Sequence, residues 1–420
     1  MIGHKGSPSG PIDGRKLRLG VAGMGRGFMA MITTLALHPR LHVVAGTDPR
    51  PEARERFARD FGARAYSTFE ELVSDDAVEA IYIASPHQFH RQQAIQAAQR
   101  GKHILVEKPM ALSLDDCRAM SDAALTAGVV LVVGHSHGFD APITHTRRLV
   151  SGGAYGDLRM ITSLNYTDFL YRPRRPEELD TAQGGGVIFS QASHQVDMVR
   201  VIAGGNAVSV RAHTGIWDAQ RPTESAYSAQ LTFSDGVIAT LVYSGHAHFD
   251  SDEFCEWVGE TGRPKQYRGH TKTRQLLKGL SSSEEEAALK KNRSYGSAGY
   301  TGPAVHAMEL EGGRFHEHFG LMIVSCEKAD LRPGPRGVAI YGDDLEDFDT
   351  LPAPVVPRAE VIDELYAAIV QGVPPLHDGP WSAANLEVCL AILQSSREGR
   401  EIALYHQIAT VGSDNGIKGR

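Results

Sequence analysis

Short apolar runs alternate with amphipathic stretches over the first third of the chain. The runs predict buried strands at 17–22, 41–47, 64–66, 80–85, 103–107 and 129–134, and the stretches between them predict helices at 28–37, 51–61, 69–73, 88–100 and 114–127. Strands that alternate with helices pair in parallel through right-handed crossovers, and helices then cover both faces of the sheet. Residues 16–138 are therefore predicted to form an α/β Rossmann domain with a doubly wound parallel sheet.

The pattern changes after about residue 140. Strands are expected at 159–167, 209–213, 226–233, 237–246 and 254–259, with a hairpin turn at 234–236 and helices at 143–151, 358–371 and 382–399. This order predicts an α+β domain with an open, mainly antiparallel sheet over residues 139–405. A polar insertion, partly helical, is expected at 264–303, and flexible tails are expected at 1–15 and 406–420.

Composition narrows the class of protein. The chain has 420 residues and a formal net charge of −7, which does not favour a nucleic-acid partner. No apolar run is long enough to cross a bilayer, and the first residues lack the apolar centre of a signal peptide. The four cysteines are far apart and form no CxxC pair. We therefore expect a cytoplasmic protein without disulfides and without a membrane segment.

A glycine-rich turn follows the first predicted strand. Gly23 and Gly25 match the first two positions of a GxGxxG motif, while the third position is Phe28, with Gly27 beside it and Arg26 before it. Glycines at a strand-to-helix turn let a pyrophosphate approach the free N–H groups of the helix. The alternative is a tight structural turn. Because a strand precedes it and a helix follows, the turn predicts a dinucleotide site.

Asp48 ends the second predicted strand. A carboxylate at this place accepts hydrogen bonds from the ribose hydroxyls and repels a 2′-phosphate, which favours NAD over NADP. Arg50 leaves NADP as an alternative, because a nearby arginine can pair with that phosphate. The expected cofactor is NAD, with NADP not excluded by these residues.

The predicted strand at 103–107 ends in the sequence Glu107-Lys108-Pro109. Ligands of open parallel sheets bind beyond the carboxyl ends of the strands, so Lys108 is expected where nicotinamide and substrate meet. An ammonium group that loses part of its hydration has a lowered pKa and can take a hydroxyl proton. Glu107 would orient Lys108 or the ribose. Pro109 would fix the turn, for example through a cis peptide bond. Taken alone, such a lysine is more often a solvated cation.

Two segments resemble the Gfo/Idh/MocA oxidoreductase family (glucose–fructose oxidoreductase, inositol dehydrogenase, rhizopine catabolism). They are ASPHQFHRQQAIQAAQRGKHILVEKPMALS at 84–113 and GGGVIFSQASHQVDM at 184–198. The resemblance implies a Rossmann domain, NAD or NADP, and a second domain that holds the substrate and often an oligomer interface. It also implies roles by position: Lys108 near the reacting oxygen, His194 as acid/base or substrate ligand, and Asp197 nearby. Ser85, Pro86, His87 and His90 would line the nicotinamide side.

One position departs from the family pattern. The family commonly has Asp four residues before the histidine, where this chain has Ser190. A serine carries no charge and is no base near neutral pH. Proton transfer would then fall to Lys108 and His194, or the substrate would present a group that a carboxylate repels. Ser190 is therefore expected to contact substrate.

The segment Tyr171-Arg172-Pro173-Arg174-Arg175 follows a predicted strand of the second domain. Arg172 and Arg174 are candidates to bind a substrate carboxylate in bidentate fashion, and the alternative is an exposed basic loop or a subunit contact. His316-Glu317-His318 has the look of a metal motif but lacks further ligands in the sequence, so no metal is expected and His318 is assigned to the substrate pocket. The pair His135 and His137 ends the last Rossmann strand at the pocket edge.

The histidine segment and the arginine loop make the chain similar, within that family, to phthalate cis-dihydrodiol dehydrogenases of aromatic catabolism. The resemblance implies an NAD(P)-dependent dehydrogenase that oxidises a secondary alcohol of a cyclic substrate, either a carboxylated cis-dihydrodiol or a sugar or polyol. A non-catalytic NAD(P)-binding redox sensor of the same fold and a metal-dependent hydrolase are the alternatives. The expected partners are an anionic or polyhydroxylated small molecule and a second copy of the chain, in a dimer or tetramer.

Overall fold

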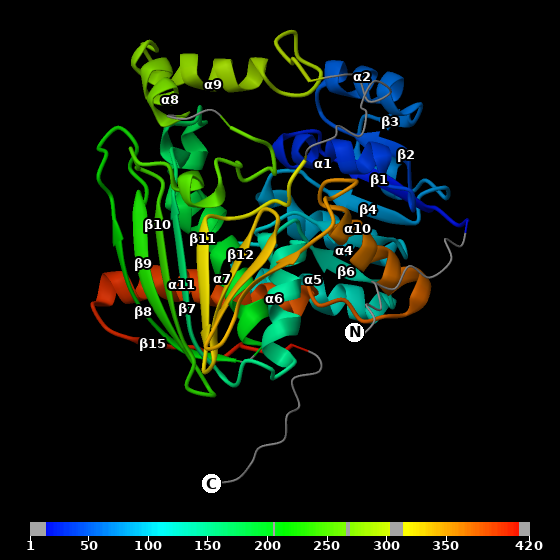
Figure 1. The fold of residues 1–420 in the computed structure, drawn as a ribbon. Coiled ribbons are helices and arrows are strands. Elements are labelled where there is room, and N and C mark those ends of the chain that lie inside the picture. The colour runs from blue at the N-terminus through cyan, green and yellow to red at the C-terminus, as the bar shows by residue number, and fades with distance from the viewer. Residues whose placement is uncertain (1–13, 205, 266–268, 303–313, 411–420) are drawn as a thin grey trace.

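The computed structural model describes residues 14–204, 206–265, 269–302 and 314–410 (Figure 1). Its first part is a six-stranded parallel sheet in the order β3-β2-β1-β4-β5-β6. The strands are β1 (Leu17–Ala22), β2 (Leu41–Thr47), β3 (Arg64–Tyr66), β4 (Ala80–Ile83), β5 (His103–Val106) and β6 (Leu131–Val133). The strand order reverses between β1 and β4, which is where a doubly wound sheet opens a ligand crevice. The predicted Rossmann fold is confirmed.

Five helices cover this sheet at the places that the sequence predicts. They are α1 (Arg26–Leu37), α2 (Pro51–Phe61), α3 (Phe69–Val73), α4 (His90–Gln99), which follows a 3₁₀ turn at His87–Phe89, and α5 (Leu114–Ala127). Local signals fix their ends: the Ser113 side chain accepts a hydrogen bond from the Asp116 backbone N–H at the start of α5, and Gly128 ends α5 in the left-handed conformation. β4 is buried along its whole length, as a strand covered on both faces must be.

The second part is built on a nine-stranded sheet in the order β14-β13-β12-β11-β7-β10-β9-β8-β15. Neighbouring strands are antiparallel except β7 and β10, which are parallel. The strands are β7 (Leu158–Tyr166), β8 (Ala207–Gly215), β9 (Ala226–Phe233), β10 (Ile238–Ser244), β11 (Leu321–Cys326), β12 (Ala329–Gly334), β13 (Gly337–Gly342), β14 (Glu346–Thr350) and β15 (Ile402–Ala403). The predicted α+β fold with an open, mainly antiparallel sheet is confirmed.

Three helices cover one face of this sheet and face the Rossmann domain (Figure 1): α6 (Ala141–Ser151), α7 (Ser193–Ala203) and α11 (Gly379–Glu398). A further helix, α10 (Ala359–Tyr366), continues into a π-helical turn at Ala367–Gln371 and packs on the Rossmann core. On the other face of the sheet, Met160, Ile238 and Ile323 remain 36–39% exposed. The two domains therefore meet through a helical layer, and one sheet face stays open in the single chain.

The strand expected at 254–259 is wrong. The segment forms a 3₁₀ helix at Ser251–Cys255, and only an isolated bridge pairs Val258 with Pro264. Asp250 caps this turn by accepting a hydrogen bond from the Asp252 N–H, and Glu256 and Trp257 have positive φ angles that interrupt an extended chain. The apolar residues of the segment fill a turn, and strands β11 to β14, which were not predicted, extend the sheet instead.

The polar insertion is largely an ordered strap. It contains α8 (Gly269–Lys278) and α9 (Ser283–Asn292) and runs from the second domain toward α2 (Figure 1). Tyr295 is fully buried there, and its ring lies 5.0 Å from the ring of Phe28 in α1. The insertion thus packs on the Rossmann helices next to the glycine turn. Residues 266–268 of the insertion lie outside the described residues.

The ends of the chain are described only in part. Residues 1–13 and 411–420, which cover most of the two expected tails, lie outside the described residues. Residues 406–410 pack against α7, since an Arg200 guanidinium N–H donates to the Ile408 carbonyl and the Thr410 hydroxyl to the Gly204 carbonyl. Among the described helices, none is long and apolar enough to cross a membrane.

Candidate active site

The glycine turn joins β1 to α1 at the crevice of the parallel sheet. Gly23 has a φ of +90°, and a Cβ there would lie 2.7 Å from the Ser85 backbone, so only glycine fits. Gly25 directly precedes α1, and no side chain caps the first N–H groups of that helix. A Cβ on Gly25 would meet no atom within 4 Å. The open space above Gly25 and the uncapped helix start fit a dinucleotide pyrophosphate.

The residues that follow divide between the cleft and the core. Arg26 is exposed at the first position of α1. A Cβ on Gly27 would lie 2.9 Å from the Glu107 side chain, so this glycine lets the glycine turn approach the end of β5. Phe28 is fully buried between Phe57 and Tyr295, so its side chain supports the turn from below and does not face the cleft.

Asp48 lies buried at the end of β2, beside the glycine turn. Its carboxylate accepts hydrogen bonds from the Met24 N–H at 2.8 Å and from the Arg50 N–H and Nε, each at 2.9 Å. The Arg50 guanidinium also donates to the carbonyls of Met24 and Tyr295, each at 3.0 Å. Arg50 is therefore held by internal acceptors, and one of them belongs to the insertion.

The loop after β4 carries the residues expected on the nicotinamide side. The Ser85 hydroxyl donates to Gln93, Pro86 is exposed, and the His87 ring lies 2.7 Å from the Gln183 carbonyl of the second domain. His90 is 1% exposed, and its two ring nitrogens lie 2.9 Å from the Ser85 carbonyl and 3.1 Å from the Pro109 carbonyl. His90 thus ties this loop to the turn after β5 and positions it.

Lys108 follows β5 and reaches across the domain boundary. Its Nζ donates to the Ser190 carbonyl at 2.8 Å, and the Lys108–Pro109 peptide is cis. Burial lowers the pKa of Lys108 to about 8, although Glu107 opposes this shift. Burial also raises the pKa of Glu107, whose carboxylate accepts a hydrogen bond from the Tyr82 hydroxyl at 2.5 Å. An amine with this pKa can exchange a proton near neutral pH.

His194 lies near the start of α7, directly after the π-helical turn at Ile188–Ala192. Its ring is 7% exposed and lies 4.9 Å from the ring of His137 and 4.9 Å from the ring of Phe319. Its Nδ1 has no hydrogen-bond partner among the described residues. Burial, together with Lys108, lowers the pKa of His194 well below its usual range, so the imidazole is neutral at pH 7.

Two of the expected substrate contacts are occupied by the protein itself. Asp197 accepts hydrogen bonds from Trp381 Nε1 at 2.6 Å and Asn385 Nδ2 at 2.8 Å, and also from the Ser136 hydroxyl. It therefore holds α11 and the loop after β6 against α7. Ser190 takes part through its carbonyl, which accepts the hydrogen bond from Lys108.

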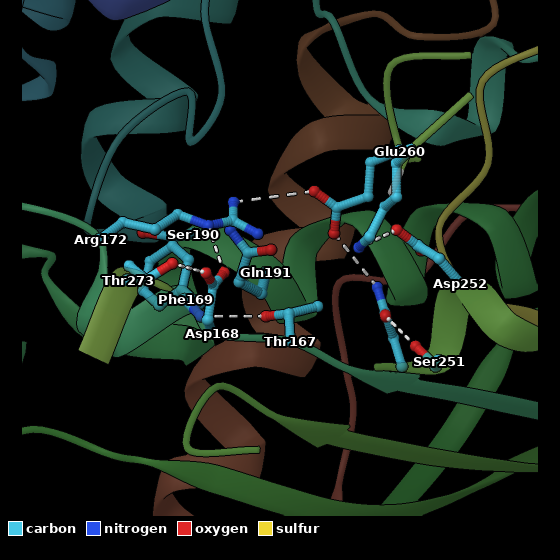
Figure 2. A network of polar contacts seen from close by, with 12 residues as sticks. Thr167, Asp168, Phe169, Arg172, Ser190, Gln191, Ser251, Asp252, Glu260 and Thr273 are labelled. Atoms are coloured by element: carbon cyan, nitrogen blue, oxygen red, sulfur yellow. Dashed lines mark hydrogen bonds and ion pairs between the residues drawn. The ribbon is translucent and has the colours of Figure 1, made fainter. Parts of the chain in front are cut away.

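The three arginines of the loop at 171–175 differ in their contacts, and Figure 2 shows those of Arg172. Arg172 donates from Nε to Asp168 at 2.8 Å, and its Nη1 lies 3.8 Å from Glu260. Arg174 is buried and donates to the carbonyl of Phe169 in its own loop. Arg175 is exposed. Of the three, Arg172 is the one that contacts both Asp168 and Glu260.

Glu260 is a site residue that the sequence analysis did not single out. Its Oε1 accepts a hydrogen bond from Asn165 at 3.4 Å, and its carboxylate stands opposite Arg172 (Figure 2). Burial alone would raise the pKa of Glu260, but Arg172 and His137 outweigh burial and hold that pKa below its usual range. Glu260 is thus a partly buried anion whose charge acts on Lys108 and raises the pKa of that amine. No local motif marks it, because the contact joins distant segments.

The segment His316-Glu317-His318 does not form one site. His316 faces the Pro352 carbonyl at 2.9 Å, and His318 faces the Val258 carbonyl at 2.8 Å while its Nδ1 accepts from the Gly320 N–H. These bonds turn the two imidazoles away from each other. His318 is buried and tied to the backbone, which makes it a wall of the site rather than a free ligand.

A cavity of about 460 Å³ lies beside Lys108 between the two domains, bordered also by Ser193, Asp197, His377 and Asn385. His377 lies 3.0 Å from Glu364 and 3.4 Å from Asp197. Burial opposes its protonation, but these two carboxylates raise the pKa of His377 to about 10. The wall of the pocket beside Lys108 therefore contains a protonated His377 between the carboxylates of Glu364 and Asp197.

Two family profiles match the chain. One, described as an oxidoreductase family with an NAD-binding Rossmann fold (GFO_IDH_MocA), matches residues 17–135, and the GFO/IDH/MocA C-terminal domain matches residues 143–264. Among curated proteins, a 1-carboxy-3-chloro-3,4-dihydroxycyclohexa-1,5-diene dehydrogenase from Comamonas testosteroni is 44% identical over 91% of this chain and 95% of its own length. The scyllo-inositol 2-dehydrogenase (NAD(+)) of Bacillus subtilis is 28% identical over 59% of this chain and 72% of its own.

Solved structures agree with the fold. A putative dehydrogenase from Bordetella bronchiseptica superposes with a TM-score of 0.85 at 43% identity and covers 92% of this chain and 100% of its own. The WlbA dehydrogenase of Bordetella pertussis, solved with NADH and UDP-GlcNAcA, has a TM-score of 0.64 at 22% identity and covers 93% of this chain and 99% of its own. The second likeness concerns the fold alone.

Proposed function

The chain belongs to the Gfo/Idh/MocA oxidoreductase family, and from this premise we propose that it is an NAD-dependent dehydrogenase of a carboxylated cyclohexadiene cis-diol. The observation that carries the proposal is the placement of Lys108. Its amine has a pKa near 8 and is bonded to the carbonyl of Ser190 between the two domains. A relative that is 44% identical over 91% of the chain acts on a diol of this kind.

The chemistry divides between the cofactor and the chain. When bound, the nicotinamide accepts a hydride from the carbinol carbon. The neutral Lys108 amine takes the proton of the same hydroxyl group, and His194 serves as a second acceptor or as a ligand of the substrate. Loss of one hydride and one proton leaves a ketone. In a cyclohexadiene ring this ketone tautomerises to a catechol, and the gain of aromaticity favours oxidation.

The charges around the site support an anionic substrate. We assign the substrate carboxylate to Arg172, the arginine of the loop that takes part in the polar network with Asp168 and Glu260 (Figure 2). Asp168 orients its guanidinium through Nε, and Glu260 lies 3.8 Å from Nη1, so we assign the substrate carboxylate to the Nη2 side of the guanidinium. Ser190 brings no charge of its own to the site, whereas Glu260 keeps one carboxylate beside Arg172. Arg174 supports the loop through its bonds to Phe169.

We assign NAD rather than NADP as the cofactor. Asp48 stands where the ribose hydroxyls of the adenosine half bind, and its negative charge disfavours a 2′-phosphate. Four hydrogen bonds hold the Arg50 guanidinium on Asp48 and on the carbonyls of Met24 and Tyr295, so few of its donors remain for that phosphate. Comparison of kcat/KM for the two dinucleotides tests this assignment, and a preference for NADP would overturn it.

We also propose that the chain works as a dimer or tetramer in the cytoplasm. The half-exposed apolar side chains of Met160, Ile238 and Ile323 lie on the open face of the nine-stranded sheet. Burial of such a face against a second copy is favourable. The four cysteines are unpaired, which fits a reducing compartment. Light scattering of the purified chain measures the oligomer, and a monomer at micromolar concentration would contradict the proposal.

The decisive assay compares two diols that differ only in the carboxylate. Purified protein with NAD should oxidise the carboxylated cis-dihydrodiol, and the unsubstituted diol should react with a much higher KM. Arg172→Ala should raise the KM of the carboxylated diol about 10- to 100-fold, as expected for a charged hydrogen bond, and leave that of the unsubstituted diol unchanged. Arg175→Ala is the matched control, because Arg175 is exposed and pairs with Glu177.

The outcomes of this assay also separate the alternatives. Equal oxidation of both diols by wild type and Arg172→Ala would refute the carboxylate assignment. Tight NAD binding without reduction of NAD by either diol or by inositols would favour the non-catalytic redox sensor.

A further inference from the structure

Four potential metal ligands meet behind His194, outside the groups that the proposed function uses. His135, His137 and Asp140 lie in the loop and 3₁₀ turn after β6, and Glu317 lies just before β11. One ligand atom from each residue lies within 4.8 Å of the others. All four side chains are at most 9% exposed. We infer that these four residues bind a divalent first-row transition metal ion, with zinc as the reference ion.

The distances suit one small ion. His135 Nε2 lies 3.4 Å from Asp140 Oδ1 and 4.0 Å from Glu317 Oε2, and His137 Nδ1 lies 2.6 Å from Asp140 Oδ2. Metal–ligand bonds of about 2.0 to 2.2 Å place ligand atoms roughly 3 to 4.4 Å apart. The His137–Asp140 contact has to open by about half an ångström, and any pair of ligand atoms near the 4.8 Å limit has to close by a similar amount.

The donor types point to the same class of ion. Two imidazoles and two carboxylates are borderline ligands that suit Zn²⁺, Mn²⁺ or Fe²⁺ better than Ca²⁺, which takes oxygen ligands only. Arg358 donates from Nε to Glu317 at 2.9 Å and so orients that carboxylate, in the way that outer contacts orient the ligands of metal sites. Asp140 and Glu317 carry two negative charges and Arg358 offsets one, so a divalent ion changes the local charge from −1 to +1.

Two further observations point to an occupant. The ring of His194 lies 4.9 Å from that of His137, and its buried Nδ1 has no hydrogen-bond partner among the described residues, which leaves it for a fifth bond or for a water on the ion. A small pocket borders Asp140 and Glu317, with Arg358 and Glu360 in its wall. The expectation that the protein binds no metal concerned His316 and His318, for which the sequence shows no further ligand cluster, whereas this site combines Glu317 with His135, His137 and Asp140.

The site would stand next to the reaction. An ion held by His135 and His137 lies one ring contact from His194, where it could hold a hydroxyl or carboxylate oxygen of the substrate and stabilise its negative charge. This role rests on the proposed function, whereas binding of the ion does not. A test of binding alone therefore separates the two proposals.

The experiment uses the full-length protein, stripped of metal by a chelator and dialysed. Equilibrium dialysis against Zn²⁺ with elemental analysis should give one equivalent per chain, and Co²⁺ should give a ligand-field absorption spectrum that Zn²⁺ abolishes. The double variant His137→Ala/Glu317→Gln should lose binding at least about 100-fold, since it removes two of four ligands. His145→Ala is the matched control, because it removes an imidazole that faces Asp349 outside the cluster.

The outcomes are independent of turnover. Circular dichroism and a thermal melt check that each variant folds. If the double variant does not fold, Glu317→Gln alone serves, with an expected loss of about tenfold or more. Binding of less than a tenth of an equivalent by wild type at micromolar Zn²⁺, or unchanged stoichiometric binding by a folded cluster variant, overturns the inference. Metal binding by a protein that fails to oxidise any diol would sustain the inference and sink only the proposed function.

Discussion

Replacing Lys108 with arginine keeps a positive charge and hydrogen-bond donors at the end of β5 but removes the ability to take a proton. The structure gives the magnitude. Burial brings the pKa of Lys108 from 10.5 to about 8. At pH 7 this raises the neutral fraction of the amine from about 1 in 3,000 to about 1 in 10, roughly a 300-fold gain in the form that accepts a proton.

The sign of the pH dependence follows from this role. Because the neutral amine is the active form, kcat/KM of the wild type should rise about tenfold per pH unit below pH 7 and level off above about pH 8. Lys108→Arg should lose about 10²- to 10⁴-fold in kcat, and the limb near pH 8 should disappear, while NAD affinity stays within about twofold. Arginine cannot be deprotonated in this range.

The assay is the initial rate of NAD reduction by a carboxylated cis-dihydrodiol between pH 5.5 and 9.5, with NAD binding measured by calorimetry. Lys16→Arg, at an exposed position, is the matched control and should behave as wild type. A Lys108→Arg variant that keeps both its rate and its pH limb would refute the role of Lys108 as proton acceptor. A wild-type rate that falls across pH 8 would show that the protonated amine is the active form.

Three further predictions follow from packing and charge. In Gly25→Ala the added Cβ meets no protein atom, so the melting temperature should match that of wild type while the Kd for NAD rises about tenfold or more. Gly23→Ala should also lower the melting temperature, because its Cβ meets the Ser85 backbone. Equal melting curves for the two variants would contradict this. Glu260→Gln should lower kcat about tenfold. It should also move the rising part of the pH–rate profile to lower pH, since a negative charge that favours protonated Lys108 is lost. A pH–rate profile that does not move would speak against a role for Glu260. Tyr295→Ala should cost about 3 to 5 kcal/mol in a denaturant titration, because a fully buried ring packed on Phe28 is removed, and a loss below about 1 kcal/mol would mean that the insertion is not anchored there.

The Rossmann half of the fold could be predicted closely from the sequence. Strands buried on both faces leave uninterrupted apolar runs, and β1, β2 and β3 begin and end at the predicted residues. The second domain was harder to predict. The apolar residues at 254–259 fill a turn fixed by Asp250 and by two positive φ angles, which the apolar pattern does not record. Strands β12 and β13 begin or end in glycine, and β14 is mostly charged, so they lack a clear apolar alternation. They join the sheet in succession, β12 on β11, β13 on β12 and β14 on β13.

Within the site, the sequence indicated the groups that sit on recognisable turns and missed those brought in from afar. Lys108 acts on His194 by lowering the pKa of its ring, and the catalytic roles of both stay predictions. Asp197 was expected to contact substrate; its carboxylate accepts hydrogen bonds from Trp381 and Asn385, and a motif alone cannot tell a substrate ligand from a contact between helices. Glu260 reaches the site from a loop whose position depends on the whole sheet of the second domain, so no local pattern could reveal it. Glu317 belongs to a recognisable motif, but its neighbours His135 and Asp140 are distant in the sequence.

Transfer of deuterium tests the central claim most directly. A carboxylated cis-dihydrodiol labelled with deuterium at the carbinol carbon is incubated with the protein and NAD, and the released dinucleotide and ring product are analysed by mass spectrometry and NMR. Hydride transfer from the carbinol carbon should leave one deuterium on carbon 4 of the reduced nicotinamide and a carboxylated catechol in equal amount. Deuterium that stays on the ring product, or the absence of reduced dinucleotide at any pH from 6 to 9, would contradict it.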